Sequence, residues 1–358
     1  GLISPKVDYT KELSVLPVQY NFTEEWARVL QRIWGHPTEL FRRYPYNTVY
    51  ITTDMLLHVY HKLFENSLIA YEEKTLRPQF AQVSSKLADH YLDLLNKTSS
   101  PDEKHIYGYL ASYWAIEASL LPSQEDILAQ IDKEKTTNPE FNDLTDEQIN
   151  TLIQEQATKN FSKLPENYKK AATESIQLIL AAKEMKYPDP LFALIMPTPP
   201  APMEIIKQDY TQFTPRSHYT NDSLLKTYFM GAKWLMREKM YVADAKGAAT
   251  ALIMAHTIPA DQLVILENMN DAIKRLIWSD DDMTITLLQK FLKDKNLSSP
   301  QAIISASADE KFRDELLALF QQKIISTSYQ TAQAKALTED KAHLLTNGLV
   351  MFGEKFTV

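Results

Sequence analysis

The 358-residue sequence contains no cysteine, and this absence excludes several kinds of site. Disulfides, thiolate zinc sites, iron–sulfur clusters and cysteine nucleophiles all require a thiol. Glycine is also scarce, with 7 residues, whereas long amphipathic segments are rich in helix-forming residues. We therefore expect a mainly α fold, a multi-helix globular body in two packed lobes, with short β segments near residues 48–53 and at the C-terminus.

Clustered positive charge is missing as well. The 38 Lys and Arg residues are outnumbered by 46 Asp and Glu residues, which gives a net charge of −8. Nucleic-acid binding requires clustered basic residues, so we expect no nucleic-acid partner. No apolar run approaches the roughly 18 to 20 residues of a membrane span, so we expect none in this chain. Residues 1–19 do not resemble a signal peptide, and a signal for export would lie outside this sequence.

A proline-rich stretch divides the sequence. Residues 187–202, YPDPLFALIMPTPPAP, contain six prolines, which oppose helix formation and favour polyproline II. We predict an N-terminal helical lobe at 1–187, a connector at 188–202 and a second helical lobe at 203–358, with one continuous core. Beyond the helix that begins near Asp54, amphipathic spacing predicts helices at about 22–34, 78–95, 102–121, 166–185, 222–241, 245–256, 261–278, 282–294 and 309–321.

The first candidate site lies in residues 47–65, NTVYITTDMLLHVYHKLFE. A β-branched run precedes a helix that we expect to begin near Asp54. At helical spacing, Asp54, His58, His61 and Glu65 form one polar stripe opposite an apolar arc. Two imidazoles one turn apart can bind a divalent metal or transfer a proton, which makes His58 and His61 candidate metal ligands. The same pattern is also typical of an ordinary solvent-exposed helix face, with Asp54 as its cap.

The second candidate site is the loop at residues 215–220, PRSHYT. Arg216 offers a planar fork for a carboxylate or a phosphate, and His218 is a third histidine that could converge on the pair in the first motif. An alternative is that Arg216 forms a buried ion pair, for example with Asp54, and so connects the two lobes. The sequence leaves both interpretations open.

Three segments together resemble a known family. The pattern T-T-D-x-L-L-H-x-Y-H-x-x-F in the first motif, residues 209–220, and L-x-x-Y-F-x-x-x-x-W-L-x-R in residues 225–237 resemble domain of unknown function 3160. The resemblance implies a bacterial or archaeal protein, often secreted or lipoprotein-like, and hence a cell-envelope or extracellular location. The family usually has Phe-Asp where this chain has Phe64-Glu65. Family members continue further, so we expect an N-terminal portion whose partner could be its own remaining C-terminal portion.

Two functions fit these observations. No serine or cysteine nucleophile signature, phosphate loop or HExxH motif is present, so the first hypothesis is a non-catalytic binding or assembly protein of the cell envelope or extracellular space, with a protein or envelope partner. The alternative is a metal-assisted hydrolase acting on surface glycan or peptide. In that case Asp54, His58 and His61 would be ligands or acid/base groups, and Arg216 and His218 would bind an anionic group.

Overall fold

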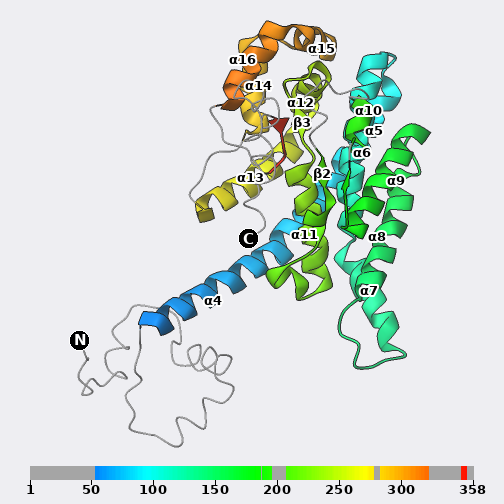
Figure 1. Ribbon diagram of the computed structural model, residues 1–358, viewed down its shortest axis with the longest axis vertical. Coiled ribbons are helices and arrows are strands. Elements are labelled where there is room, and N and C mark those ends of the chain that lie inside the picture. The colour runs from blue at the N-terminus through cyan, green and yellow to red at the C-terminus, as the bar shows by residue number, and fades with distance from the viewer. Residues whose placement is uncertain (1–52, 187, 196–206, 278–282, 322–347, 353–358) are drawn as a thin grey trace, which may run out of the picture. The chain divides into compact units, whose positions relative to one another are not determined.

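The computed structural model describes residues 53–186, 188–195, 207–277, 283–321 and 348–352 (Figure 1). The chain divides into two compact units, residues 1–66 and 67–358. The described part of the first unit belongs to helix α4 (Thr53–Tyr71), so the helix predicted from near Asp54 onward is present. The predicted β segment near 48–53 lies outside the described residues, except that Thr53 is already helical.

Helices dominate the second unit, which confirms the mainly α fold. After α4 the helical elements are the π turn η2 (Glu72–Leu76), α5 (Arg77–Lys97), α6 (Pro101–Leu120), α7 (Gln124–Lys135), α8 (Asp146–Phe161), α9 (Glu166–Ala181), α10 (Phe192–Ile195), the 3₁₀ turns η4 (Tyr210–Phe213) and η5 (Ser217–Thr220), α11 (Ser223–Arg237), α12 (Ala245–Thr257), α13 (Ala260–Ile277), α14 (Ile285–Asp294), α15 (Pro300–Ala308) and α16 (Glu310–Gln321).

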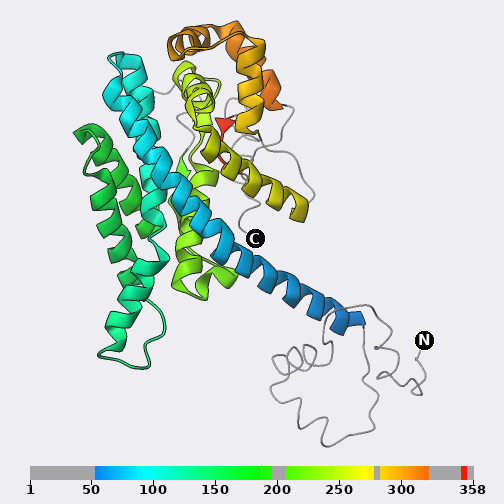
Figure 2. The same ribbon diagram turned by 180° about the vertical axis from the view of Figure 1, so that it is seen from behind.

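Helix α6 lies at the centre of the second unit. It packs against α5, α8, α9 and α11, and almost its whole length is buried. In Figure 2 the cyan α5 and α6 run beside the green α8 and α9. Trp234 of α11 donates a hydrogen bond of 3.0 Å from Nε1 to the carbonyl oxygen of Tyr113. Gly108 permits a close approach by α9, because a Cβ atom there would lie 2.3 Å from the ring of Tyr168.

Side-chain caps fix where several helices begin. Ser100, Ser123, Asp222 and Asp244 each accept hydrogen bonds from backbone N–H groups in the first turn of α6, α7, α11 and α12. Thr145 and its partner three residues later form a capping box at the start of α8. These groups satisfy N–H donors that have no partner within the helix, so the helix boundaries follow from local sequence.

The strands are short and pair across long sequence separations. Strand β1 (Met185–Lys186) pairs antiparallel with β2 (Gln208–Asp209), and β3 (Met240–Tyr241) pairs antiparallel with β4 (Gly348–Leu349). The predicted strand near the C-terminus is therefore confirmed at β4. Residues 353–358 lie outside the described residues.

The proline-rich stretch differs from the prediction. Four residues of it, Phe192–Ile195, form the short helix α10 between two groups of prolines. The reason is Asp189, whose Oδ1 accepts hydrogen bonds from the backbone N–H groups of Leu191 and Phe192 at 3.0 and 3.1 Å. The hydrophobic core includes residues on both sides of this stretch. The division into lobes at 188–202 stays a prediction.

None of the helices in the described ranges is by itself long and apolar enough to cross a membrane. Helices α12 and α13 reach that length and hydropathy only when taken together, and they bend by 106° at the break between them.

Candidate functional site

The polar stripe predicted on α4 is present and open to solvent. Asp54 and His58 are exposed, and His61 Nε2 lies 4.0 Å from Glu65 Oε2. Lys62 Nζ lies 2.6 Å from the same carboxylate oxygen. Within the described part of the chain, no three His, Asp or Glu side chains form a group that could bind a metal ion. Metal binding by His58 and His61 stays a prediction.

The second motif places its two candidate residues differently. Arg216 has an extended backbone and an exposed side chain. Its pairing with Asp54, which belongs to the other unit, stays a prediction. His218 is buried, and its Nε2 lies 3.0 Å from Glu72 Oε2. The two motifs belong to different units, so the convergence of His218 on His58 and His61 stays a prediction.

A π turn brings Glu72 into position for this contact. The backbone N–H of Arg77 donates to the carbonyl oxygen of Glu72, five residues earlier, which widens the helix there. Pro78 follows directly and has no N–H, and its ring would crowd the carbonyl of Lys74 in a regular helix. The wider turn accommodates that ring, so α4 continues through η2 into α5, and the segment predicted as a separate helix at about 78–95 is part of this continuous run. Such turns occur frequently at functional sites.

Each oxygen of the Glu72 carboxylate has a hydrogen-bond partner in the second motif. Tyr219 donates from its hydroxyl to Glu72 Oε1 at 2.7 Å, while His218 contacts Oε2. The rings of His218 and Tyr219 lie 4.0 Å apart between centroids, and Tyr219 packs on Phe229 at 5.0 Å. Burial raises the pKa of Glu72, and the hydrogen bonds from Tyr219 and His218 oppose that rise. We call Glu72, His218 and Tyr219 the carboxylate cluster.

Backbone strain marks the loop that supplies the cluster. Ser217 has a positive φ of 56°, a left-handed conformation that a residue with a Cβ adopts at a cost of about 1 kcal/mol or more. The two hydrogen bonds to Glu72 hold the adjacent residues in place and offset this cost. The carboxylate cluster therefore holds the loop in place. The imidazole of His218 contacts Glu72, a residue of the same unit.

Arg77, beside the π turn, makes a second set of buried hydrogen bonds. Its Nε donates to Thr227 Oγ1 at 3.1 Å, and its Nη2 donates to the carbonyl oxygen of Pro122. Burial lowers the pKa of Arg77 to about 10. Nearby carboxylates oppose this shift, and Asp222 has the largest effect among them. Sequence reasoning missed Arg77, because an arginine before a proline gives no indication of burial.

A group of buried acids was also missed. Asp189 accepts a hydrogen bond from the hydroxyl of Tyr210, and Glu238 Oε1 accepts one of 2.8 Å from the hydroxyl of Tyr109. Burial raises the pKa of both carboxyl groups, and the charge of Asp189 adds to the rise at Glu238. A cavity of about 20 Å³ adjoins both carboxylates, together with Arg237. This volume holds about one water molecule, so the acids lack room for a substrate.

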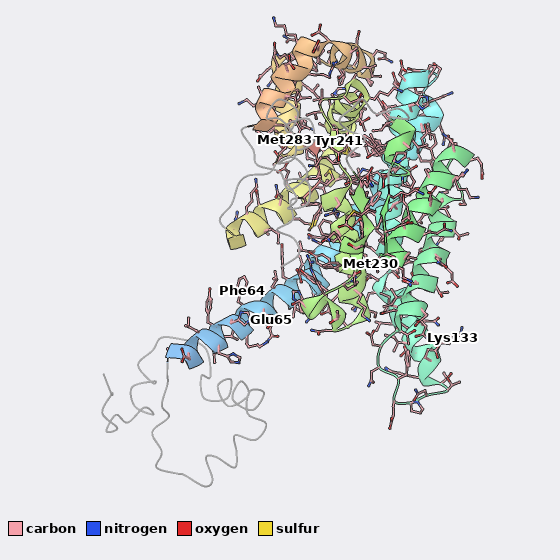
Figure 3. The ribbon with its side chains drawn as sticks, viewed as in Figure 1. Phe64, Glu65, Lys133, Met230, Tyr241 and Met283 are labelled. Atoms are coloured by element: carbon pink, nitrogen blue, oxygen red, sulfur yellow. The ribbon has the colours of Figure 1, made fainter. Side chains whose placement is uncertain are left out.

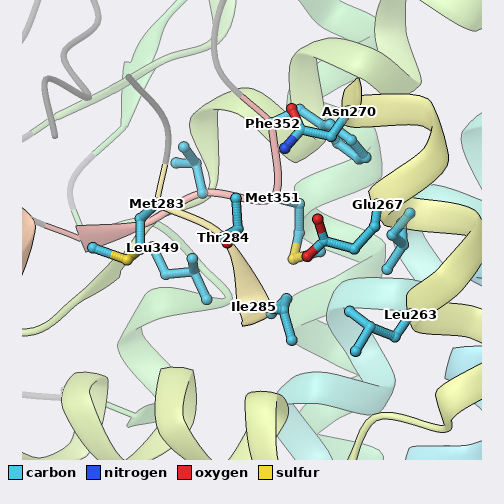
Figure 4. A pocket seen from close by; sticks show the side chains of 11 residues that line it. Leu263, Glu267, Asn270, Met283, Thr284, Ile285, Leu349, Met351 and Phe352 are labelled. Carbon is cyan, nitrogen blue, oxygen red and sulfur yellow. The ribbon is translucent and has the colours of Figure 1, made fainter. Parts of the chain in front are cut away.

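A second small pocket lies between α13, the start of α14 and the segment around β4 (Figure 4). Glu267 and Asn270 contribute polar groups to a lining that is otherwise largely apolar. Glu267 Oε1 accepts a hydrogen bond of 2.7 Å from Thr286 Oγ1. Its volume of about 20 Å³ again suits a single water molecule, so this pocket is no candidate for a substrate site.

Sequence comparison decides the family. A model of the family described as "Protein of unknown function (DUF3160)" matches residues 16–358. The chain belongs to this family. The match includes both motifs and confirms the resemblance inferred from them. No curated protein and no solved structure matches the chain. Since the DUF3160 family is itself described as one of unknown function, the function must be argued from the residues.

Proposed function

We propose that the protein is a non-catalytic binding or assembly protein of the cell envelope or extracellular space, and that α4 binds its protein partner. The observation that carries this proposal is an apolar face left exposed on α4. Leu57, Tyr60 and Phe64 have exposed fractions of 62%, 69% and 40%. We call these three residues the α4 face; Phe64 is labelled in Figure 3. The envelope or extracellular location is supported by the family resemblance alone.

The spacing of the α4 face suits a protein groove. The three residues stand at positions i, i+3 and i+7, which places them on one side of a helix. Helices that insert into an apolar groove of a partner use this spacing for their anchoring residues. Large apolar side chains exposed together on a soluble domain commonly mark such an interface.

The charges beside the α4 face favour a protein over a lipid surface. Helices that lie on membranes carry Lys and Arg along their polar side. The polar stripe of α4 instead carries two carboxylates, Asp54 and Glu65, and its nearby Lys62 already pairs with Glu65. A negatively charged lipid surface would repel this stripe, whereas a protein groove can present complementary donors along its rim.

The exposed fractions set the size of the effect. Full burial of a large apolar side chain contributes about 1.5–3 kcal/mol. Because the side chains of the α4 face are about half exposed, their burial against a partner would contribute about half of that free energy. Each anchor should then contribute about 0.8–1.5 kcal/mol to binding. Loss of all three would weaken binding by about two to three orders of magnitude.

A matched pair of triple variants tests the proposal. Leu57→Ser, Tyr60→Ser and Phe64→Ser together remove the α4 face, whereas Asp54→Ser, His58→Ser and His61→Ser remove the polar stripe of the same helix. We expect the wild-type chain and the stripe variant to co-isolate the same partner from source cells, and the face variant to lose it. Loss in the stripe variant with retention in the face variant would refute the proposal.

The hydrolase alternative is favoured by one observation, the exposure of His58 and His61 one turn apart on α4. Elemental analysis of the purified chain separates the two functions. The binding proposal predicts no stoichiometric zinc, manganese or iron that depends on these histidines. One equivalent of metal that disappears in the double variant His58→Ala, His61→Ala, together with histidine-dependent hydrolysis of envelope glycan or peptide, would establish the alternative.

A further inference from the structure

A pocket of about 450 Å³ is lined in part by Pro215 and Thr220 of the second motif. None of the three residues of the carboxylate cluster lines it. Four elements meet there: the start of α8, the end of α9, the loop from η4 to η5, and α11. Met230 of α11, labelled in Figure 3, is one of its lining residues. The volume falls within the range of about 300–1,000 Å³ typical of sites for small molecules.

The walls of this pocket are mainly apolar. Ile149 of α8, Ile179 of α9, Phe213 of η4 and Met230 are all buried residues that contribute to the lining. Side chains of this kind form an apolar wall, and a hydrocarbon group placed against that wall is itself removed from water. The pocket is therefore suited to a ligand with an apolar body.

Two lysines supply positive charge at the same pocket. Lys226 Nζ lies 2.7 Å from Asp146 Oδ1, so one of the positive charges is already compensated. Lys183, which follows the end of α9, is exposed and makes no ion pair with any described residue. The two ammonium groups and one carboxylate leave one positive charge in excess, which favours a ligand with a single negative charge.

The loop that forms one wall is held rigidly. Phe213 and Thr220, which line the pocket, bracket His218 and Tyr219, which hydrogen-bond to Glu72. A wall fixed in this way needs little reordering when a ligand enters, so less binding free energy is lost. Arg216 belongs to the same loop but is not a lining residue, so the excess charge rests on the lysines.

We propose that this pocket binds a small monoanionic amphiphile, with the apolar chain against Ile149, Ile179 and Phe213 and the anionic group at Lys183 and Lys226. This site shares no residue with the α4 face, and its occupancy does not depend on the proposed function. No bond is made or broken in the proposed event, which is binding alone.

Titration calorimetry with octanoate tests this proposal on the full chain, with octanol and octylamine as probes that have the same chain but lack the negative charge. We expect saturable binding of one octanoate per chain, and binding at least about tenfold weaker for the other two probes. Lys183→Met and Lys226→Met should each weaken octanoate binding about tenfold, as expected for loss of a charge-assisted hydrogen bond. Lys170→Met, an exposed lysine outside the lining, is the matched control.

A second variant tests the location without altering charge. Ala181 lines the pocket and is exposed, so Ala181→Phe should fill the space while the fold is retained. We expect it to abolish octanoate binding, whereas Ala129→Phe, at an exposed position on α7 outside the lining, should not. No saturable binding, equal binding of the three probes, or binding unchanged in Ala181→Phe would overturn the proposal.

Discussion

The hydrogen bond from Tyr219 to Glu72 gives the sharpest prediction about stability. Tyr219→Phe removes one hydroxyl group and keeps the ring that packs on Phe229. Glu72 is buried, so its Oε1 would lose its hydroxyl donor with little access to water. A hydrogen bond to a charged group contributes about 1.5–3 kcal/mol, so we expect the free energy of unfolding to fall by about 2 kcal/mol.

Urea unfolding followed by circular dichroism at pH 7 measures this loss. Tyr168→Phe is the control, because its hydroxyl contacts the carbonyl oxygen of Lys104 at a longer 3.3 Å and, among the described residues, bonds no carboxylate. We expect a loss of about 0.5–1 kcal/mol there. In a Glu72→Gln background, Tyr219→Phe should cost about 1 kcal/mol less than in the wild type, because the acceptor is neutral. Equal losses in the two backgrounds would refute the reasoning.

Three further predictions follow from the described residues. Burial raises the pKa of Glu117 well above its ordinary value of 4.5, so the folded state keeps a proton that the unfolded state loses, and stability falls as pH rises above 4.5. Glu117→Gln should remove up to about 1.4 kcal/mol of that fall per pH unit, measured by urea unfolding between pH 5 and 8; identical slopes would contradict this. Gly108→Ala forces the ring of Tyr168 to move, and should lower the free energy of unfolding by about 1–3 kcal/mol; no measurable loss would show that the contact is looser. His58→Ala and His61→Ala, both at exposed positions, should each change it by less than about 0.5 kcal/mol, and a larger loss would reveal buried contacts.

The sequence predicted those elements whose structure depends on interactions between neighbouring residues. The helix predicted at 102–121 is α6, because apolar residues on every side of a helical segment indicate burial. The capping box at Thr145 was also predictable, since its two side chains bond to backbone groups three residues apart. Both features depend on neighbours within a few positions, so a single sequence specifies them.

Non-local contacts account for what the sequence could not predict. Pro78 indicated the start of a separate helix, but the π turn lets the helix continue into α5. Strand β3 at Met240–Tyr241 was missed, since its partner β4 lies more than a hundred residues later and two-residue strands show no periodicity. Helix α15 was also missed, because Pro300–Ala308 is short and its hydrophobic pattern weak.

Non-local contacts also explain why the candidate site was predicted only in part. The second motif pointed to His218, but its partner Glu72 lies 146 positions away in a charged segment that is typical of a solvated surface. Asp189 stands between two prolines, which indicates a turn but not the buried hydrogen bond from Tyr210. Residue type and spacing identify reactive groups, whereas the hydrogen-bond partners of these groups are set by the tertiary fold.

Site-specific photocrosslinking in source cells tests most directly the claim that α4 binds a protein partner. A photoreactive phenylalanine analogue at Tyr60 would probe the α4 face, and the same analogue at Leu128 or Val264 would control for exposure, since these are 46% and 58% exposed on α7 and α13. We predict one discrete protein adduct from position 60 that is absent from both controls. No adduct at position 60, or the same adducts at all three positions, would contradict the claim.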